Sequence, residues 1–273
     1  MEGALRVAYP GREGAHSAAA CAVLFPDERA EALPSFADVV EAVASGRFDA
    51  GVLPIESSIA GPVAETHDLL VGSGVSVNAQ AILPIRHFLV GVADVPLEEI
   101  TIVRSHPVAL DQCRRLLASL PGATAIAAGT TADAAAQVAH DGDPTEVAIA
   151  SERAAALHGL VVLAADVGDH PEAYTRFVAI SNRTALGRSD GWRVAFSFQT
   201  DHRPGALHRA IEPFARHGLD LVQLTSRPIP QTPWRYRFDA VVVGSPQDDV
   251  VRETLAEVRG QAQSFTVFGS YPA

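Results

Sequence analysis

Short apolar segments alternate with capped, amphipathic segments from residue 4 to about residue 180, and this alternation limits the possible folds more than any other feature. Runs of four to eight apolar residues between turn signals are typical of buried strands. Strands are therefore expected at residues 4–9, 48–55, 75–83, 100–105, 123–128, 146–151 and 160–166. Because strands that alternate with helices usually form parallel sheets covered by helices, the pattern predicts an α/β fold.

Polar residues at the expected helix starts support this interpretation. Ser35 and Thr130 each precede an aspartate by three residues, as an N-cap does in a capping box. Ser105 and Ser151 are further expected N-caps, and Pro107 stands in a first turn, where a missing N–H costs little.

The order of the segments predicts two lobes. The chain is expected to leave lobe one near residues 79–83 and to return near residues 167–175, so that lobe one holds about residues 1–80 and 167–182 and lobe two about residues 81–166. Ligands of open α/β sheets bind beside such crossing points, which predicts a ligand cleft between the lobes.

The composition changes after Ile180. The segment "SNRTALGRSDG" reads as a linker, and residues 192–273 follow in the order strand, helix, strand, strand, helix, strand. This βαββαβ order is that of a ferredoxin-like domain. Pro213, inside the first of its helices, predicts a kink or a break there.

Charge and composition narrow the class of partner. The formal net charge is −11, which argues against nucleic acid or an anionic membrane as a partner. No apolar run is long enough to cross a bilayer, and no secretory signal is evident at the N-terminus, so a cytoplasmic location is expected. Cys21 and Cys113 have no metal-ligand spacing and are expected to be buried thiols.

Several ordered motifs resemble those of the prephenate dehydratase family, with arogenate dehydratase as a close relative. The motifs are "VAYPGREGAHS", "GVLPIESSIAGPV", "SHPVALDQC", "VAIASERAAALHGL", "TRF" and, in the tail, "RPGALH" with "LTSRP". The resemblance implies a two-lobed catalytic region of the periplasmic-binding-protein-like type (type II) over residues 1–182. It also implies a regulatory ACT domain over residues 192–273.

The resemblance further implies a lyase of phenylalanine biosynthesis that converts prephenate into phenylpyruvate by loss of water and carbon dioxide. This chemistry requires no cofactor and no metal, and the sequence has no phosphate-binding loop, metal cluster or dinucleotide fingerprint. A homodimer or homotetramer with L-phenylalanine as a possible effector is implied as well. The alternatives are an arogenate dehydratase and, from another class, a non-catalytic ligand-binding or sensor protein.

By resemblance, Thr175, Arg176, Glu56 and Ser57 are the candidate catalytic residues. Thr175 would donate a hydrogen bond or a proton to the leaving hydroxyl. Arg176 could bind a carboxylate, or form an ion pair between lobes, since strand alternation directs it away from the face of Thr175. Glu56 could act as an acid or fix its loop through a paired neighbour, and Ser57 departs from the asparagine usual in the family.

The candidate substrate-binding residues come from both lobes. Thr131 and Ser105 are also explained as helix caps, Phe177 as a core residue, and the glycines by tight packing. Just before Thr175, Glu172 and Ala173 depart from the usual asparagine. The full set is Gly11, Gly14, Ser17, Ser58, Ser105, Gln112, Thr131 and Phe177.

In the tail, two motifs are expected to form a phenylalanine site between the ACT domains of two subunits. Thr225 departs from the usual glutamate and His208 from the usual valine, so an ACT domain that serves only for dimerisation is the alternative. The motif residues are Gly205, Ala206, Leu207, Thr225, Ser226, Arg227 and Pro228.

Overall fold

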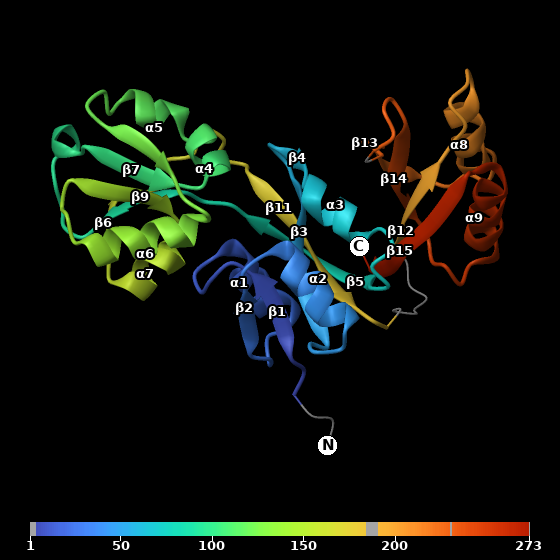
Figure 1. Cartoon of the computed structure of the whole chain (residues 1–273), viewed down its shortest axis with the longest axis horizontal. Helices are drawn as coiled ribbons and strands as arrows, with labels where there is room; N and C mark the ends of the chain where they lie inside the picture. The colour runs from blue at the N-terminus through green and yellow to red at the C-terminus, as the bar shows by residue number, and fades with distance from the viewer. Residues whose placement is uncertain (1–3, 184–190, 230, 273) are drawn as a thin grey trace.

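The computed structural model describes residues 4–183, 191–229 and 231–272. Within these residues the strands form a ten-stranded sheet and a five-stranded sheet (Figure 1). The small sheet belongs to one lobe, and the large sheet runs from a second lobe into the C-terminal domain. The predicted class, a two-lobed α/β region followed by a ferredoxin-like domain, is confirmed.

Lobe one contains one half of the large sheet. Its strands lie in the order β5 (Ser76–Pro84), β11 (Tyr174–Ser181), β3 (Ala50–Ser57), β1 (Val7–Pro10) and β2 (Ala30–Leu33), and β4 (Gly61–Pro62) pairs with β3. β1 is parallel to β2 and β3, whereas β11 is antiparallel to both β3 and β5. The expected parallel sheet is therefore only partly correct in lobe one, because β11, which returns from lobe two, lies between β3 and β5 and runs antiparallel to both.

Helices cover both faces of this half of the sheet. α1 (His16–Leu24) packs on one face against a core that contains Val7, Val52 and Phe177. α2 (Phe36–Ala44) and α3 (Ala64–Leu70) pack on the opposite face, against a core that contains Val178 and Ile180. Successive residues of β11 thus serve opposite faces, as strand alternation requires.

Lobe two is built on the five-stranded sheet. Its order is β10 (Val161–Ala164), β6 (Phe88–Gly91), β9 (Glu146–Ala150), β7 (Ile102–Ser105) and β8 (Thr124–Ala127). α6 (Thr131–Asp141) and α7 (Glu152–His158) contribute to the core on one face. The core on the other face draws on α4 (Pro107–Asp111) and α5 (Arg114–Ala118), and η1 (Leu97–Glu99) lies before β7.

Three of the four predicted N-caps are confirmed. The hydroxyls of Ser35, Thr130 and Ser151 each accept a hydrogen bond from the backbone N–H three residues on, at 3.0–3.1 Å. The prediction for Ser105 is wrong, because Ser105 ends β7 and its hydroxyl donates to the Ile149 carbonyl at 2.6 Å. His106 takes the cap position of α4 instead.

The C-terminal domain has the predicted βαββαβ order. Its elements are β12 (Trp192–Gln199), α8 (Ala206–Arg216), β13 (Leu221–Pro228), β14 (Tyr236–Val243), α9 (Asp249–Gln261) and β15 (Ser264–Pro272). The antiparallel order β13-β14-β12-β15 is ferredoxin-like. Of the expected kink or break at Pro213, the break is absent, because α8 continues through Pro213 to Arg216. Pro213 lies near the helix end and lacks the N–H of one helical hydrogen bond.

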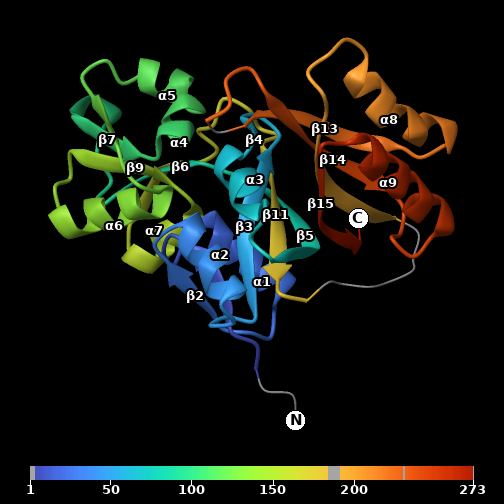
Figure 2. The ribbon, with the colours of Figure 1, turned by 45° about the vertical axis from the view of Figure 1, so that its right-hand side comes forward.

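The C-terminal domain joins lobe one through the backbone (Figure 2). Gly269 of β15 pairs with Val77 of β5, which makes the ten strands one continuous sheet. A Cβ on Gly269 would lie 2.1 Å from the Val77 carbonyl oxygen, so a glycine is required at this contact. Side chains of both domains share one core there, including Val178, Ala195, Val241 and Phe268. No helix in the described part of the chain is both long and apolar enough to cross a membrane.

Candidate active site

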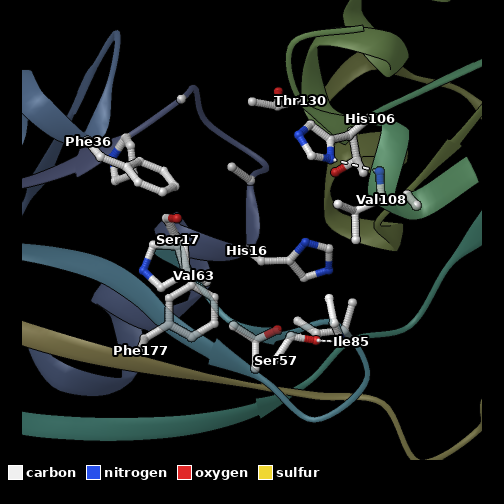
Figure 3. A pocket seen from close by; sticks show the side chains of 18 of the residues that line it. His16, Ser17, Phe36, Ser57, Val63, Ile85, His106, Val108, Thr130 and Phe177 are labelled. Atoms are coloured by element: carbon white, nitrogen blue, oxygen red, sulfur yellow. Dashed lines mark hydrogen bonds between the residues drawn. The ribbon is translucent and has the colours of Figure 1, made fainter. Parts of the chain in front are cut away.

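A cleft of about 590 Å³ lies between the two lobes (Figure 3). Lobe one contributes residues such as Ser17, Phe36 and Phe177, and lobe two contributes His106 and Val108. Of the predicted site residues, the cleft brings together Gly11, Ser17, Ser57, Gln112, Thr131, Thr175 and Phe177.

Thr175 and Phe177 enter the cleft from the same face of β11. Thr175 pairs in register with Ser57 of β3, and both side chains line the cleft. Phe177 is only 2% exposed and also packs against α1. Ala173, just before β11, is buried in the cleft wall, whereas Glu172 is exposed. The Thr175 hydroxyl is thus held beside an aromatic ring by paired strands on both sides.

Arg176 and Glu56 lie on the opposite face of the sheet. Arg176 Nε is 3.3 Å from Glu56 Oε2, and Arg176 Nη1 donates to Gln80 Oε1 at 2.9 Å. Arg176 also lines a cavity of about 20 Å³ together with residues of the C-terminal domain, such as Asp239 and Tyr271. Neither Arg176 nor Glu56 is among the described residues that line the cleft.

The two glycines of the turn before α1 have different surroundings. Gly11, with φ +99°, lines the cleft. Gly14 instead packs against α7 of lobe two, where a Cβ would lie 3.1 Å from Ala154, and its carbonyl accepts a hydrogen bond from Ser151. The N-terminus of α1 then opens on the cleft: the cap position is occupied by Ala15, which offers no side-chain hydrogen bond.

The start of α6 faces the cleft from lobe two. Thr130 and Thr131 both line the cleft, and Thr130 caps the helix. The Asp133 carboxylate accepts a hydrogen bond from the Thr130 hydroxyl and forms a salt bridge with Arg12 of lobe one. This pair links the two lobes beside the start of α6.

Ser57 and Ser58 have separate roles in the loop after β3. The Ser57 hydroxyl accepts from the backbone N–H groups of Ile59 and Ala60, at 3.3 and 3.2 Å, while the side chain lines the cleft. The Ser58 hydroxyl accepts from Tyr174 N at 2.9 Å, which ties the loop to β11. Ser58, like Gly14 and the fully buried Ser105, is not among the described residues lining the cleft.

Three histidines line the cleft, and none of them was anticipated from the sequence. His16 begins α1, His87 follows β5, and His106 caps α4. Burial lowers the pKa of His16 to about 4, with a smaller contribution from His87, and burial also lowers the pKa values of His87 and His106. His16 is therefore neutral at neutral pH.

The cleft lining is mostly apolar and carries little charge. The chain has no lysine, and no arginine is among the described residues that line the cleft. Glu65 is the one carboxylate in that described lining. An anion in this cleft must therefore rely on backbone N–H groups, hydroxyls, amides and imidazoles. Among the described residues, no group of three His, Cys, Asp or Glu side chains could hold a metal ion.

A buried polar cluster joins lobe one to the C-terminal domain. His67 Nδ1 lies 3.1 Å from Asp239 Oδ2, and Arg237 donates to both Asp239 and Asp68. Burial alone would raise the pKa of Asp239, but hydrogen bonds from His67, Arg237 and Ser197 lower it. Asp239 is therefore charged at neutral pH although it is only 2% exposed.

The predicted regulatory residues fall into two places. Ala206 and Leu207 line a hollow of about 340 Å³ together with Thr200–Pro204 and Phe238, and Gly205 caps α8 with φ +78° beside them. The second motif, Thr225, Ser226, Arg227 and Pro228, lies on β13, outside the described lining of that hollow. Arg227 donates to Asp68 of lobe one.

The fold and the cleft define the class of the protein: a two-lobed α/β catalytic region with a C-terminal ACT domain. Two family models match the chain, the one described as prephenate dehydratase over residues 7–185 and the one described as ACT domain over residues 196–260. The chain belongs to the prephenate dehydratase family.

Individual relatives agree with this assignment. Arogenate dehydratase/prephenate dehydratase 2 of Arabidopsis thaliana is 32% identical over 98% of this chain and 73% of its own length. The structure of prephenate dehydratase from Arthrobacter aurescens, solved in complex with L-Phe, has a TM-score of 0.89 at 31% identity and covers 98% of this chain and 90% of its own. A quorum-quenching acylase, GqqA, has a TM-score of 0.87 at 31% identity and covers 98% of each chain.

Proposed function

We propose that the chain is a prephenate dehydratase that binds prephenate in the cleft between its lobes. The observation that carries this proposal is the Thr175 hydroxyl beside Phe177 and the uncapped start of α1, in a chain of this family. Prephenate loses its ring carboxylate as carbon dioxide and its ring hydroxyl as water, with uptake of one proton. The product, phenylpyruvate, gains an aromatic ring, and this gain drives the reaction.

The two carboxylates of prephenate bind to neutral donors at helix starts. The first N–H groups of a helix have no partner within the helix, and the helix dipole favours an anion there. α1 and α6 begin on opposite walls of the cleft, with Ser17 in one first turn and Thr131 in the other. One carboxylate at each helix start would hold prephenate across the cleft, and this binding would favour approach of the lobes.

Thr175 assists departure of the ring hydroxyl. A threonine is too weak an acid to transfer a proton early, so its hydroxyl acts as a preorganised donor to the oxygen on which negative charge develops. Pairing of β11 with β3 and β5 supports this function, because it fixes the backbone of Thr175 on both sides. Ser57 and Gln112 provide further polar contacts, and Phe177 lies against the ring.

Arg176 and Glu56 are assigned a structural function rather than a catalytic one. Their ion pair and the contact of Arg176 with Gln80 connect three adjacent strands on the face toward the C-terminal domain. The pair would thus support β11 from behind, in agreement with the alternative of an ion pair that holds parts of the protein together.

Residues 192–273 are assigned the regulatory function. The ACT family match and the Phe-bound structural relative support L-phenylalanine as the effector, bound near Gly205 and Leu207 in a homodimer or homotetramer. Calorimetry with L-phenylalanine and sedimentation analysis with and without it test these two assignments. Absence of both a heat change and a rate effect would leave the domain an assembly function only.

The decisive experiment measures product formation by the purified protein from both substrates side by side, phenylpyruvate from prephenate and phenylalanine from arogenate. The proposal requires the larger kcat/KM with prephenate. A larger value with arogenate would make the chain an arogenate dehydratase, which differs only in accepting an amino group for a keto group. Binding of prephenate without phenylpyruvate formation would identify a ligand-binding or sensor protein.

A further inference from the structure

A side-chain hydrogen bond connects the crossover between the lobes with the cleft. The ring nitrogen Nε2 of His87 lies 2.9 Å from Oε1 of Gln112, and both residues line the cleft. His87 lies between β5 of lobe one and β6 of lobe two, and Gln112 follows α4 in lobe two. The bond therefore joins the segment that connects the two lobes to a side chain in the wall of lobe two.

The chemistry of the two groups sets the direction of this bond. An amide oxygen only accepts, so the ring nitrogen that faces it must donate, and His87 carries its proton on Nε2. The Gln112 nitrogen, with two N–H donors, is then directed away from His87. We propose that His87 is a positioning residue: it holds the Gln112 amide in the one orientation that presents N–H donors to an oxygen of the substrate. This inference rests on the proposed function and deepens it.

The backbone supports both partners from the same side. Val167 N donates to the His87 carbonyl at 2.9 Å, and Asp169 N donates to the Gln112 carbonyl at 2.6 Å. The Asp169 carboxylate in turn accepts from the backbone N–H groups of Arg114 and Arg115 at the start of α5. The returning crossover, residues 167–169, thus holds the main chain of both residues, and only side-chain rotation remains to be set.

The surroundings of His87 keep it neutral. His87 is only 4% exposed, and its Nδ1 atom is buried without a hydrogen-bond partner in the described part of the chain. A second proton on Nδ1 would therefore be a buried donor with no acceptor, which is costly. His16 faces His87 edge-on with ring centroids 6.4 Å apart, and it adds no negative charge. A neutral ring has one donor, so rotation of the Gln112 amide would place N–H against N–H.

The test separates this positioning function from simple packing. His87→Phe keeps a ring but loses the donor, and His87→Gln replaces the donor with an amide. For prephenate we expect His87→Phe to lower kcat/KM about tenfold, mainly through KM, because a contact to a substrate oxygen is lost before the chemical step. In His87→Gln, we expect the decrease in the logarithm of kcat/KM to be at most half of the decrease in His87→Phe. His140→Phe, at an exposed histidine of α6, serves as the matched control and should match the wild type.

A double-mutant comparison with Gln112 tests whether His87 acts through the Gln112 side chain. In a Gln112→Ala background, His87→Phe should change kcat/KM less than about twofold, since residues that act as a unit are not additive. A wild-type-like His87→Phe, or an equal loss in both backgrounds, would overturn the inference. A wild type that forms no phenylpyruvate would reject the proposed function instead.

Nitrogen-15 NMR of the imidazole gives a readout that does not depend on activity. Because burial lowers the pKa of His87, we expect its neutral Nε2–H tautomer to persist below pH 6.5, where an ordinary histidine becomes charged. A proton on Nδ1, or a charged ring at neutral pH, would contradict the inferred orientation of Gln112 whether or not prephenate is converted.

Discussion

Thr175 and Arg176 are adjacent on β11, yet their side chains face opposite sides of the sheet. Thr175 lines the cleft between the lobes, whereas Arg176 pairs with Glu56 and lines the small cavity at the C-terminal domain. Two adjacent residues thus divide into one that faces the cleft and one that faces the C-terminal domain. Mutations at the two positions should have different consequences.

Thr175→Ala should lower kcat for prephenate by about 10²–10³, the effect of removing one preorganised donor. Thr175→Ser should retain most of the activity, because it keeps the hydroxyl. Thermal unfolding should be nearly unchanged in both variants. Thr124→Ala, on an exposed position of β8, is the control for loss of a threonine from a strand. Near-normal turnover by Thr175→Ala would remove Thr175 from the mechanism.

Arg176→Gln should reduce stability more than catalysis. The variant leaves the partly buried Glu56 without its partner, which should lower the free energy of unfolding by about 1–2 kcal/mol. Because Arg176 does not reach the cleft, kcat should stay within about threefold of the wild-type value. Urea unfolding and steady-state kinetics check both expectations. A large loss of kcat without a loss of stability would restore a catalytic function for this arginine.

Asp239→Asn should weaken the contact between lobe one and the C-terminal domain. It removes the charge that pairs with the buried Arg237, and breaking a buried pair costs about 3 kcal/mol at pH 7. Urea unfolding monitored at both domains checks this loss. Asp68 still pairs with Arg237 in the variant, so a smaller loss would show that Asp68 compensates.

The same carboxylate predicts a pH dependence. Because the folded-state pKa of Asp239 lies below the ordinary value of 3.8, its contribution is fully present above that value and is lost as the pH falls through the lower folded pKa. The wild type should therefore lose stability faster than Asp239→Asn below pH 3.8. Parallel curves for the two proteins would contradict the assignment.

Gly269→Ala should disrupt the joint between the domains. A Cβ at this position would meet the Val77 backbone at 2.1 Å, and the residue's φ of +154° is unfavourable for alanine. We expect the free energy of unfolding to fall by more than about 3 kcal/mol and proteolysis to become faster, both measured against Gly122→Ala, where a Cβ meets nothing within 4 Å. Equal stability of the two variants would show that the strands separate without cost.

Glu65→Gln should alter the choice between prephenate and arogenate. Glu65 supplies the one carboxylate in the described lining of the cleft, and arogenate differs from prephenate by an ammonium group that a carboxylate can pair with. The variant should lower the ratio of kcat/KM for arogenate to that for prephenate about threefold or more, a loss of the size of one exposed ion pair. An unchanged ratio would place the amino group away from Glu65.

Local signals were sufficient to predict much of the fold. Ser35, Thr130 and Ser151 cap helices as expected, because a cap depends on residues within one turn. β2, with the sequence AEAL, was not predicted, since its residues favour a helix and only pairing with β1 makes it a strand. Ser105 shows the same limit: its hydroxyl bonds to Ile149, a partner 44 residues away that no local pattern indicates.

The site was predictable where strand alternation and motifs coincide. Alternation along β11 correctly separated Thr175 and Phe177 from Arg176, although it did not show which face is the cleft. The histidines were missed because His16, His87 and His106 come from three separate segments and meet only after the lobes pack. The sequence around a single histidine does not indicate which distant residues lie near it in the fold.

The scarcity of charge in the cleft also bears on the end of the catalytic cycle. In the proposed reaction, prephenate brings two carboxylates, and phenylpyruvate retains one, because the other departs as carbon dioxide. No arginine in the described lining forms an ion pair with the carboxylate that remains. In the proposed reaction, departure of the product would therefore break hydrogen bonds to neutral groups, which water readily replaces.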